Sequence, residues 1–145
     1  MKKSLSDMTS AEKAPKKQIG AFKEINGDQA QIDLDMLRKH NVFFATPCYG
    51  GLVTDQFFLS MFRTSQTFMS HGINFRITTL RNESLITRAR NIMVAMFLES
   101  DCSHLMFIDA DIEFDAESIL RALAYDKPIM AAAYPKKALP VQYAI

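Results

Sequence analysis

The chain has 145 residues, of which 48% are hydrophobic and 23% are charged, and its formal net charge is +1. This balance is typical of a globular domain and lacks the clustered basic face that nucleic-acid binding requires. No uninterrupted apolar run is long enough to span a bilayer, and the opening lysines are not followed by the apolar core of a signal peptide. We therefore expect a cytoplasmic protein with no transmembrane segment and no nucleic-acid partner.

Residues 1–36 are polar, rich in Lys, Ser, Asp, Glu and Gln, and show little periodicity. This composition predicts a loosely ordered leader, although residues 32–37 have the pattern of a short helix or an edge strand. Residues 37–145 are predicted to form one domain. Its two cysteines, Cys48 and Cys102, lack the spacing of a zinc site, so we expect reduced thiols rather than a disulfide or a zinc site.

Four short apolar segments predict β-strands, at residues 42–45, 73–80, 105–108 and 128–134. The run at 105–108 is apolar throughout, which is typical of a strand that is buried on both faces of a parallel sheet. The segment at 73–80 instead alternates between apolar and polar residues. We therefore expect it nearer an edge of the sheet.

Three segments with helical periodicity lie between these strands. The first is expected to begin after the N-cap Thr54 and to end at Gly72. The second is expected to be capped by Ser84, and the third to span residues 116–125 after the N-cap Asp115. The residues expected to face the sheet are Phe58, Met61, Phe62, Ser65, Phe68 and Met69 in the first helix and Leu85, Ala89, Ile92, Met93 and Met96 in the second. This alternation predicts an α/β fold, with a mainly parallel open sheet and helices on both faces.

The apolar run at 105–108 ends in two acidic residues, Asp109 and Asp111. If the extended backbone continues through Ala110, both carboxylates project to the same side. Mg²⁺ and Mn²⁺ prefer such oxygen ligands, with water and substrate phosphates completing the shell. Because ligands bind outside the carboxyl ends of strands in open α/β sheets, the pair predicts a metal site for a diphosphate. The alternative is structural, because Asp commonly ends strands and favours turns.

Two further clusters, at residues 46–51 and 81–84, follow the first two predicted strands. The carboxyl ends of parallel strands share one edge of a sheet, so both clusters are expected beside the acidic pair. Pro47 and the paired glycines Gly50 and Gly51 stop the first strand and allow the backbone to approach a ligand closely.

Two arginines in the helix after Ser84 are expected to point in different directions. A step of about 100° per residue places Arg88 and Asn91 near Ser84 and turns Arg90 away. Arg88 is then positioned to meet phosphate at the helix N-terminus, where the dipole also favours anions. The alternative for both arginines is a solvated face, with pairing to Glu83.

Four motifs occur along the chain, TPCYGG at 46–51, NESLITRARN at 82–91, HLMFIDADIEF at 104–114 and AAAYPKK at 131–137. Together and in this order they resemble glycosyltransferases of the GT-A fold, in the family 2-like group found in bacteria, phages and large viruses. The resemblance covers roughly residues 42–137 and implies a nucleotide-sugar-binding α/β domain.

The resemblance also implies roles for individual residues. Asp109 and Asp111 would hold Mn²⁺ or Mg²⁺ against the diphosphate of the sugar nucleotide, with Asp111 as the surer direct ligand. The residues implied to bind the nucleotide are Pro47, Tyr49 and Gly50 around the nucleoside, Asn82 or Glu83 at the base, and the segment from Arg88 to Asn91 along its border.

The implied function is transfer of a sugar from a nucleotide-diphosphate donor to a glycan, protein or lipid acceptor. No catalytic base is identified, and the chain ends at Ile145 soon after the fourth predicted strand. We therefore expect a fragment that lacks the acceptor half. Three alternatives stay open: a non-catalytic fragment that binds nucleotide sugars, a sugar nucleotidyltransferase, and a phosphatase of the haloacid dehalogenase type with Asp109 as nucleophile.

Overall fold

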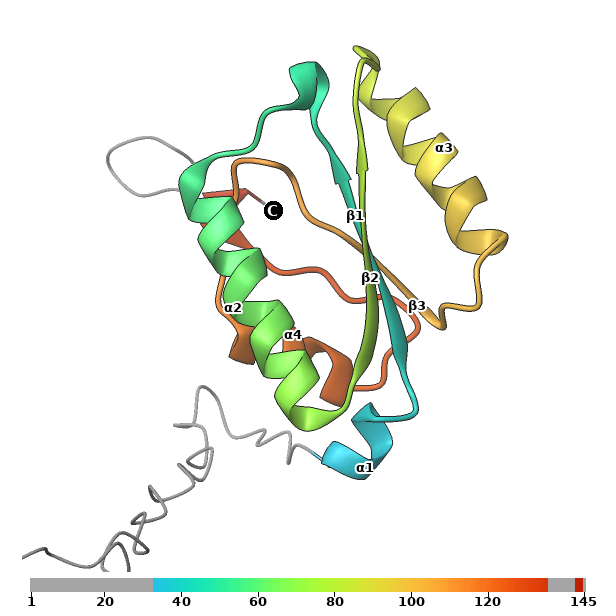
Figure 1. Cartoon of the computed structure of the whole chain (residues 1–145), viewed down its shortest axis with the longest axis vertical. Coiled ribbons are helices and arrows are strands. Elements are labelled where there is room, and N and C mark those ends of the chain that lie inside the picture. The colour runs from blue at the N-terminus through green and yellow to red at the C-terminus, as the bar shows by residue number, and fades with distance from the viewer. Residues whose placement is uncertain (1–32, 136–142, 145) are drawn as a thin grey trace, which may run out of the picture.

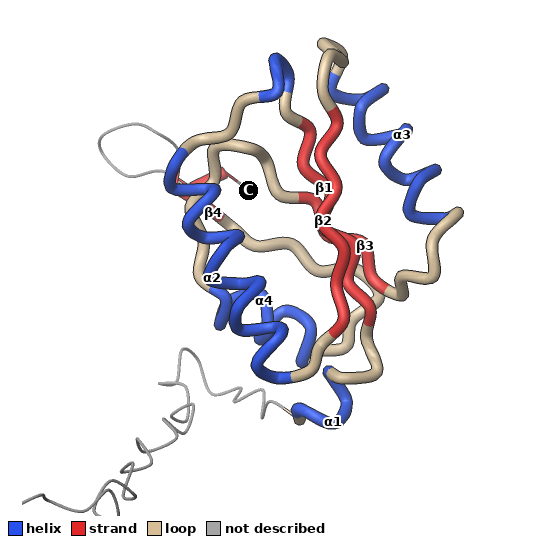
Figure 2. The backbone as a smooth tube through the Cα atoms, in the orientation of Figure 1, coloured by secondary structure: helices blue, strands red, loops and turns tan. Residues whose placement is uncertain are grey.

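The strand β1 (Asn41–Pro47) forms the centre of a three-stranded parallel sheet in the order β2-β1-β3. The computed structural model describes residues 33–135 and 143–144, so most of the predicted leader, residues 1–32, lies outside the described part. The other elements are the helices α1 (Leu34–Leu37), α2 (Asp55–His71), α3 (Ile86–Leu98) and α4 (Ala116–Ala124), the 3₁₀ turn η1 (Tyr49–Gly51), and the strands β2 (Asn74–Leu80), β3 (His104–Phe107), β4 (Tyr134–Pro135) and β5 (Tyr143–Ala144). Figure 1 shows this arrangement, and Figure 2 separates helices from strands.

Alternate residues of β1 bury the two faces of the sheet. Val42 and Phe44 lie in the larger apolar cluster, which α1, α2 and α4 complete, whereas Phe43 and Ala45 lie in a smaller cluster with Met93 of α3. Burial of each of these phenylalanines contributes about 1.5–3 kcal/mol. The predicted α/β class, with a parallel sheet and helices on both faces, is therefore confirmed.

The predicted ends of α2 are confirmed. The Thr54 hydroxyl accepts a hydrogen bond from the Phe57 N–H at 3.3 Å, and Gly72 closes the helix in the left-handed conformation with φ of 71°. The predicted buried face is partly wrong. The residues that α2 buries are Phe57, Ser60, Met61, Thr64 and Phe68, whereas Phe58, Phe62 and Met69 are exposed.

Two hydroxyl residues explain how the buried face of α2 differs from the apolar pattern. The Thr64 hydroxyl donates to the Ser60 carbonyl at 2.8 Å, and the Ser60 hydroxyl accepts from the Phe114 N–H at 3.1 Å. Because these polar groups are paired, their burial has little cost, and their small size allows α2 to pack closely. A count of apolar residues alone misses such positions.

The predicted helix behind Ser84 also differs in detail. Its N-cap is Leu85, without a side-chain cap, and the Glu83 carboxylate accepts the Leu85 N–H at 3.0 Å. Of the predicted apolar face only Ala89 and Met93 are buried, because α3 covers the smaller cluster by itself. The predicted N-cap Asp115 of α4 is confirmed, since its carboxylate accepts the Ser118 N–H.

The strand predicted at 105–108 is present as β3 but is less buried than expected, and the one predicted at 128–134 is wrong over residues 128–133. β3 has a neighbour on one side only among the described residues, and all four of its residues are half-buried rather than buried on both faces. Residues 128–133 form no strand and are exposed; only the short β4 follows, paired antiparallel with β5. Three consecutive alanines at 131–133 offer little side-chain area to bury, which explains why this apolar segment does not join the sheet.

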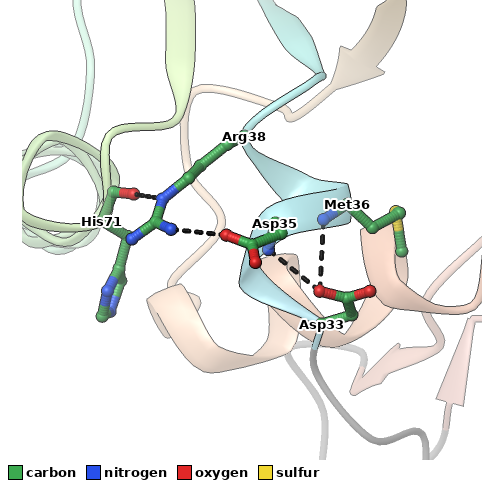
Figure 3. A network of polar contacts seen from close by, with 5 residues as sticks. All are labelled: Asp33, Asp35, Met36, Arg38 and His71. Atoms are coloured by element: carbon green, nitrogen blue, oxygen red, sulfur yellow. Dashed lines mark hydrogen bonds and ion pairs between the residues drawn. The ribbon is translucent and has the colours of Figure 1, made fainter.

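The amino edge of the sheet, where its strands begin, is closed by α1 and by one arginine (Figure 3). Residues 34–37 form the short helix that the sequence allowed, capped by the Asp33 carboxylate. The Arg38 guanidinium donates to the His71 carbonyl at 2.9 Å and pairs with Asp35 at 2.7 Å. Arg38 thus satisfies a carbonyl in the last turn of α2 and ties that turn to α1.

Candidate functional site

The loops after β1 and β2 lie against each other at the carboxyl edge of the sheet, where its strands end (Figure 1). The Cys48 N–H donates to the Leu80 carbonyl at 2.9 Å, and a Cβ at Gly51 would lie only 3.1 Å from the Cδ of Arg81. Two of the predicted clusters are therefore adjacent.

The acidic segment after β3 is fixed by the start of α2. The Thr54 N–H donates to the Ala110 carbonyl at 3.0 Å, and the Ile112 N–H donates to the Asp109 carbonyl at 3.2 Å. Ala110 and Asp111 form a turn, so the extended backbone ends before them. The argument that both carboxylates project to one side from a continuing strand therefore does not apply.

Asp109 forms an ion pair with Arg90 of α3. The Arg90 Nη2 lies 3.0 Å from the Asp109 Oδ1, and its guanidinium lies 5.6 Å from the centre of the Phe107 ring. The two side chains are 46% and 39% exposed, so both remain open to solvent. Arg90, which the helical angles turned away from Ser84, thus contacts the acidic segment after β3 while it remains partly exposed.

The position of Arg90 has a detectable signal in the sequence. The predicted apolar face of this helix is broad, but only Ala89 and Met93 of it are buried. Steps of about 100° place Arg90 within about 60° of Met93, at the border of the face that packs on the sheet. A long side chain at that border can reach the end of β3.

Arg88 is held by Glu83 instead of projecting freely into the site. Its Nε lies 2.6 Å from the Glu83 Oε2 and its Nη2 lies 2.7 Å from the Oε1, which also accepts the Leu85 N–H. The hydrogen bond from Arg88, followed by that from the Leu85 N–H, lowers the pKa of Glu83, and the same pairing raises the pKa of Arg88. The structure thus agrees with the alternative in which Arg88 pairs with Glu83.

The remaining predicted nucleotide residues lie at the surface near the carboxyl edge. Tyr49 and Gly50 are exposed in η1, and Pro47 is half-buried at the end of β1. Asn82 is exposed with φ of 61°, a conformation in which Asn is enriched, and Asn91 is exposed on α3.

A cleft of about 710 Å³ opens beside the first half of α2. This volume is within the range of small-molecule sites, about 300–1,000 Å³. The residues that line the cleft are Thr54, Gln56, Arg63, Asp111, Ile112, Glu113, Phe114, Asp115, Tyr134 and Pro135. Asp111 is the one lining residue that the sequence placed in a site. Gln56, Arg63 and Tyr134 were missed, since the first two lie on an ordinary exposed helix face and Tyr134 comes close only through the chain's return past α4.

Asp109 and Asp111 have different surroundings: Arg90 of α3 holds the former, and the cleft beside α2 contains the latter. Among residues 33–135 and 143–144, no group of three or more His, Cys, Asp or Glu side chains is arranged to hold a metal ion. Two carboxylates still suit Mg²⁺ or Mn²⁺ when phosphate and water supply the other ligands. Of the two, Asp111 is the one that faces a space for such a ligand.

Comparisons of the chain with family models, with curated proteins and with solved structures found no match. Within the described part of the chain, none of the helices has the length and apolar character needed to cross a membrane. Both cysteines are free, Cys48 in the core and Cys102 half-buried.

Proposed function

We propose that this protein binds a nucleotide-diphosphate sugar in the presence of Mn²⁺ or Mg²⁺ and acts as a glycosyltransferase of the GT-A type. The observation that carries the proposal is the position of Asp111. Asp111 lines a cleft of about 710 Å³ beside α2 and belongs to the segment that follows the carboxyl end of β3. Open α/β sheets bind ligands outside the carboxyl ends of their strands. The order of the four motifs along the chain supports the same function.

The chemistry assigned to each residue follows from its place around the cleft. A bound divalent cation would neutralise charge on the leaving diphosphate as the sugar–phosphate bond breaks. Asp111 would hold that cation directly, and Arg63 of the same cleft would bind phosphate oxygens. Asp109 would add a second carboxylate, and its negative charge would be balanced by the paired Arg90. We place the reaction in the cytoplasm, with a glycan, protein or lipid as acceptor.

A haloacid dehalogenase mechanism is less well supported by the same geometry. It requires Asp109 as a nucleophile that faces the substrate, yet the Asp109 carboxylate pairs with Arg90 and does not line the cleft. A protein that binds nucleotide sugars without transferring them shares the donor site, and a transfer assay separates it from the enzyme.

The first experiment is calorimetric titration with UDP and GDP, each with Mn²⁺ and with a chelator. We expect one nucleotide to bind in a metal-dependent way, and Asp111→Asn to weaken that binding at least about tenfold, since it removes a charged ligand of the metal. The matched control is Asp101→Asn, because Asp101 is another exposed carboxylate, lies at the amino edge and pairs with Arg76 at 3.6 Å. Equal affinity in parent and Asp111→Asn would refute the site; release of nucleotide from a UDP- or GDP-sugar on addition of an acceptor would establish transfer.

A further inference from the structure

The outer side of β2 forms an open lateral edge of the sheet, which is distinct from the amino and carboxyl edges at the strand ends. Among the described residues, β2 pairs with β1 alone, so the backbone N–H and C=O groups along its other side have no strand partner. Four exposed apolar side chains flank this edge, and we name them the α2–β2 strip. They are Phe58, Phe62 and Met69 of α2, which are 58%, 52% and 65% exposed, and Ile77 of β2, which is 43% exposed.

The strip lies on one face of the sheet. Phe75 of β2 packs edge-on against Phe68 of α2 at 5.7 Å, and Ile77, two residues further along the strand, points to the same side. On α2, Phe58 and Phe62 stack with their ring centres 6.3 Å apart.

The strip is on the flank of α2 that faces away from α4. The opposite flank carries Ser60, whose hydroxyl accepts the Phe114 N–H just before α4. Steps of about 100° per residue place Phe58, Phe62 and Met69 on the other side of the buried face. An open row of backbone hydrogen-bonding groups therefore runs beside an apolar helix surface.

We propose that the α2–β2 strip and the open edge of β2 bind a second copy of this chain. The two β2 strands pair antiparallel about a two-fold axis that passes through the sheet near Ile77, which makes a continuous six-stranded sheet. This axis keeps both α2 helices on the same face. With strands about 4.8 Å apart and packed helices about 8–10 Å apart, the two α2 helices meet along the strip.

The charges of the strip and strand suit a second copy. The strip has no charged residue, and Arg76 is the one charged residue of β2. With Ile77 at the axis, Arg76 lies opposite Thr78 of the second copy, and its own charge is paired with Asp101 of the same chain. The two α2 helices run antiparallel, so that their dipoles attract. β2 also lacks the lysine or proline with which natural edge strands prevent such pairing.

Sedimentation equilibrium of the full chain over a range of concentrations up to about 100 µM, a range that detects micromolar association, tests this proposal. We expect a monomer–dimer equilibrium. Ile77→Lys and Phe62→Lys are each expected to weaken it at least about tenfold, because each would bury an unpaired charge. The control is Ile129→Lys, the same change at an isoleucine that is 90% exposed outside the strip. Circular dichroism of each variant establishes that it is folded.

A parent chain that stays monomeric throughout this range would overturn the proposal. A dimer that folded Phe62→Lys and Ile77→Lys leave intact would overturn it as well, since another surface would then join the copies. If either lysine variant does not fold, the milder changes Phe62→Ser and Ile77→Thr are used with the same expected direction.

Discussion

The two edges of the sheet use their polar side chains in different ways. At the amino edge, side chains mostly bond to backbone groups: Arg38 to the His71 carbonyl, and the Ser103 hydroxyl to the Asn41 N–H at 2.8 Å. At the carboxyl edge, charged side chains bond mainly to each other, as in the pairs of Arg90 with Asp109 and Arg88 with Glu83. The first arrangement stabilises the ends of helices and strands. The second leaves charges at the surface, where a ligand can take the place of a partner.

The histidines belong to the amino edge as well. His40 and His104 lie with their ring centres 4.2 Å apart. Burial, followed by the proximity of His40, lowers the pKa of His104. The His104 ring is thus expected to be neutral and structural rather than part of a binding site.

The largest effect is expected at the amino edge, from Arg38→Ala. This change removes the hydrogen bond to the last turn of α2 and the pair with Asp35, and we expect the free energy of unfolding to fall by about 1.5 kcal/mol, limited by partial exposure. Urea unfolding measures it, with Arg63→Ala as the control on an exposed face of α2. A loss no larger than that of the control would contradict the structural role of this edge.

A change of about 1 kcal/mol in the opposite direction is expected at the carboxyl edge, from Thr46→Val. The Thr46 side chain is fully buried near the end of β1, and its hydroxyl has no hydrogen-bond partner among the described residues. Replacing the hydroxyl by a methyl group of similar size removes that cost, so unfolding should require more urea.

Thr64→Val is the matched control for this measurement. Thr64 is equally buried, but its hydroxyl donates to the Ser60 carbonyl at 2.8 Å, so the same change should destabilise the protein. Opposite signs for the two variants would sharpen the contrast between a polar group that is satisfied and one that is not. Destabilisation by both would show that the Thr46 hydroxyl has a partner.

A smaller effect on stability, within about 0.5 kcal/mol, is expected from Arg90→Ala, because the pair with Asp109 is nearly half-exposed. The substitution should instead change the affinity of the protein for Mn²⁺. Without the arginine, both Asp109 oxygens are free for a cation, and we expect Mn²⁺ alone to bind about threefold more tightly, as measured by water proton relaxation. Weaker Mn²⁺ binding would mean that Arg90 positions a carboxylate that the metal requires.

The smallest expected change is in the pH dependence of stability in Glu83→Gln. Because the folded state lowers the pKa of Glu83, its contribution is present above the unfolded pKa and is lost as the pH falls through the folded pKa. Thermal unfolding below about pH 5 should therefore depend less on pH in the variant. Parallel curves for variant and parent would show that the pair with Arg88 adds no stability.

Much of the fold could be predicted because its signals are local. The Thr54 and Asp115 caps and the Gly72 stop depend on side chains within one helical turn, so the sequence around them is sufficient. The central place of β1 and the edge position of β3 depend on pairing between distant segments. The length of an apolar run does not reveal how many neighbours a strand has.

The candidate site was harder to predict for the same reason. Asp111 could be named from the local motif, whereas the cleft that contains it requires α2 and Tyr134 to come together. Arg88 and Arg90 differ by two positions in the chain, yet one pairs with its neighbour in sequence and the other with Asp109, 19 residues away. Helical angles predict such contacts only when the buried face of the helix is known.

Because Gly51 lies close to Arg81, the residues tolerated in the loop after β1 are expected to depend on those in the loop after β2. Gly51 has φ of 73°, so any other residue there pays about 1–2 kcal/mol for its backbone, and its Cβ also presses on the Arg81 side chain. In a library that randomises both positions, a shorter residue at 81 should relieve the contact but not the backbone cost. Variation at 51 should therefore be rare on every background, and its few survivors should be found mainly where Arg81 has already been replaced.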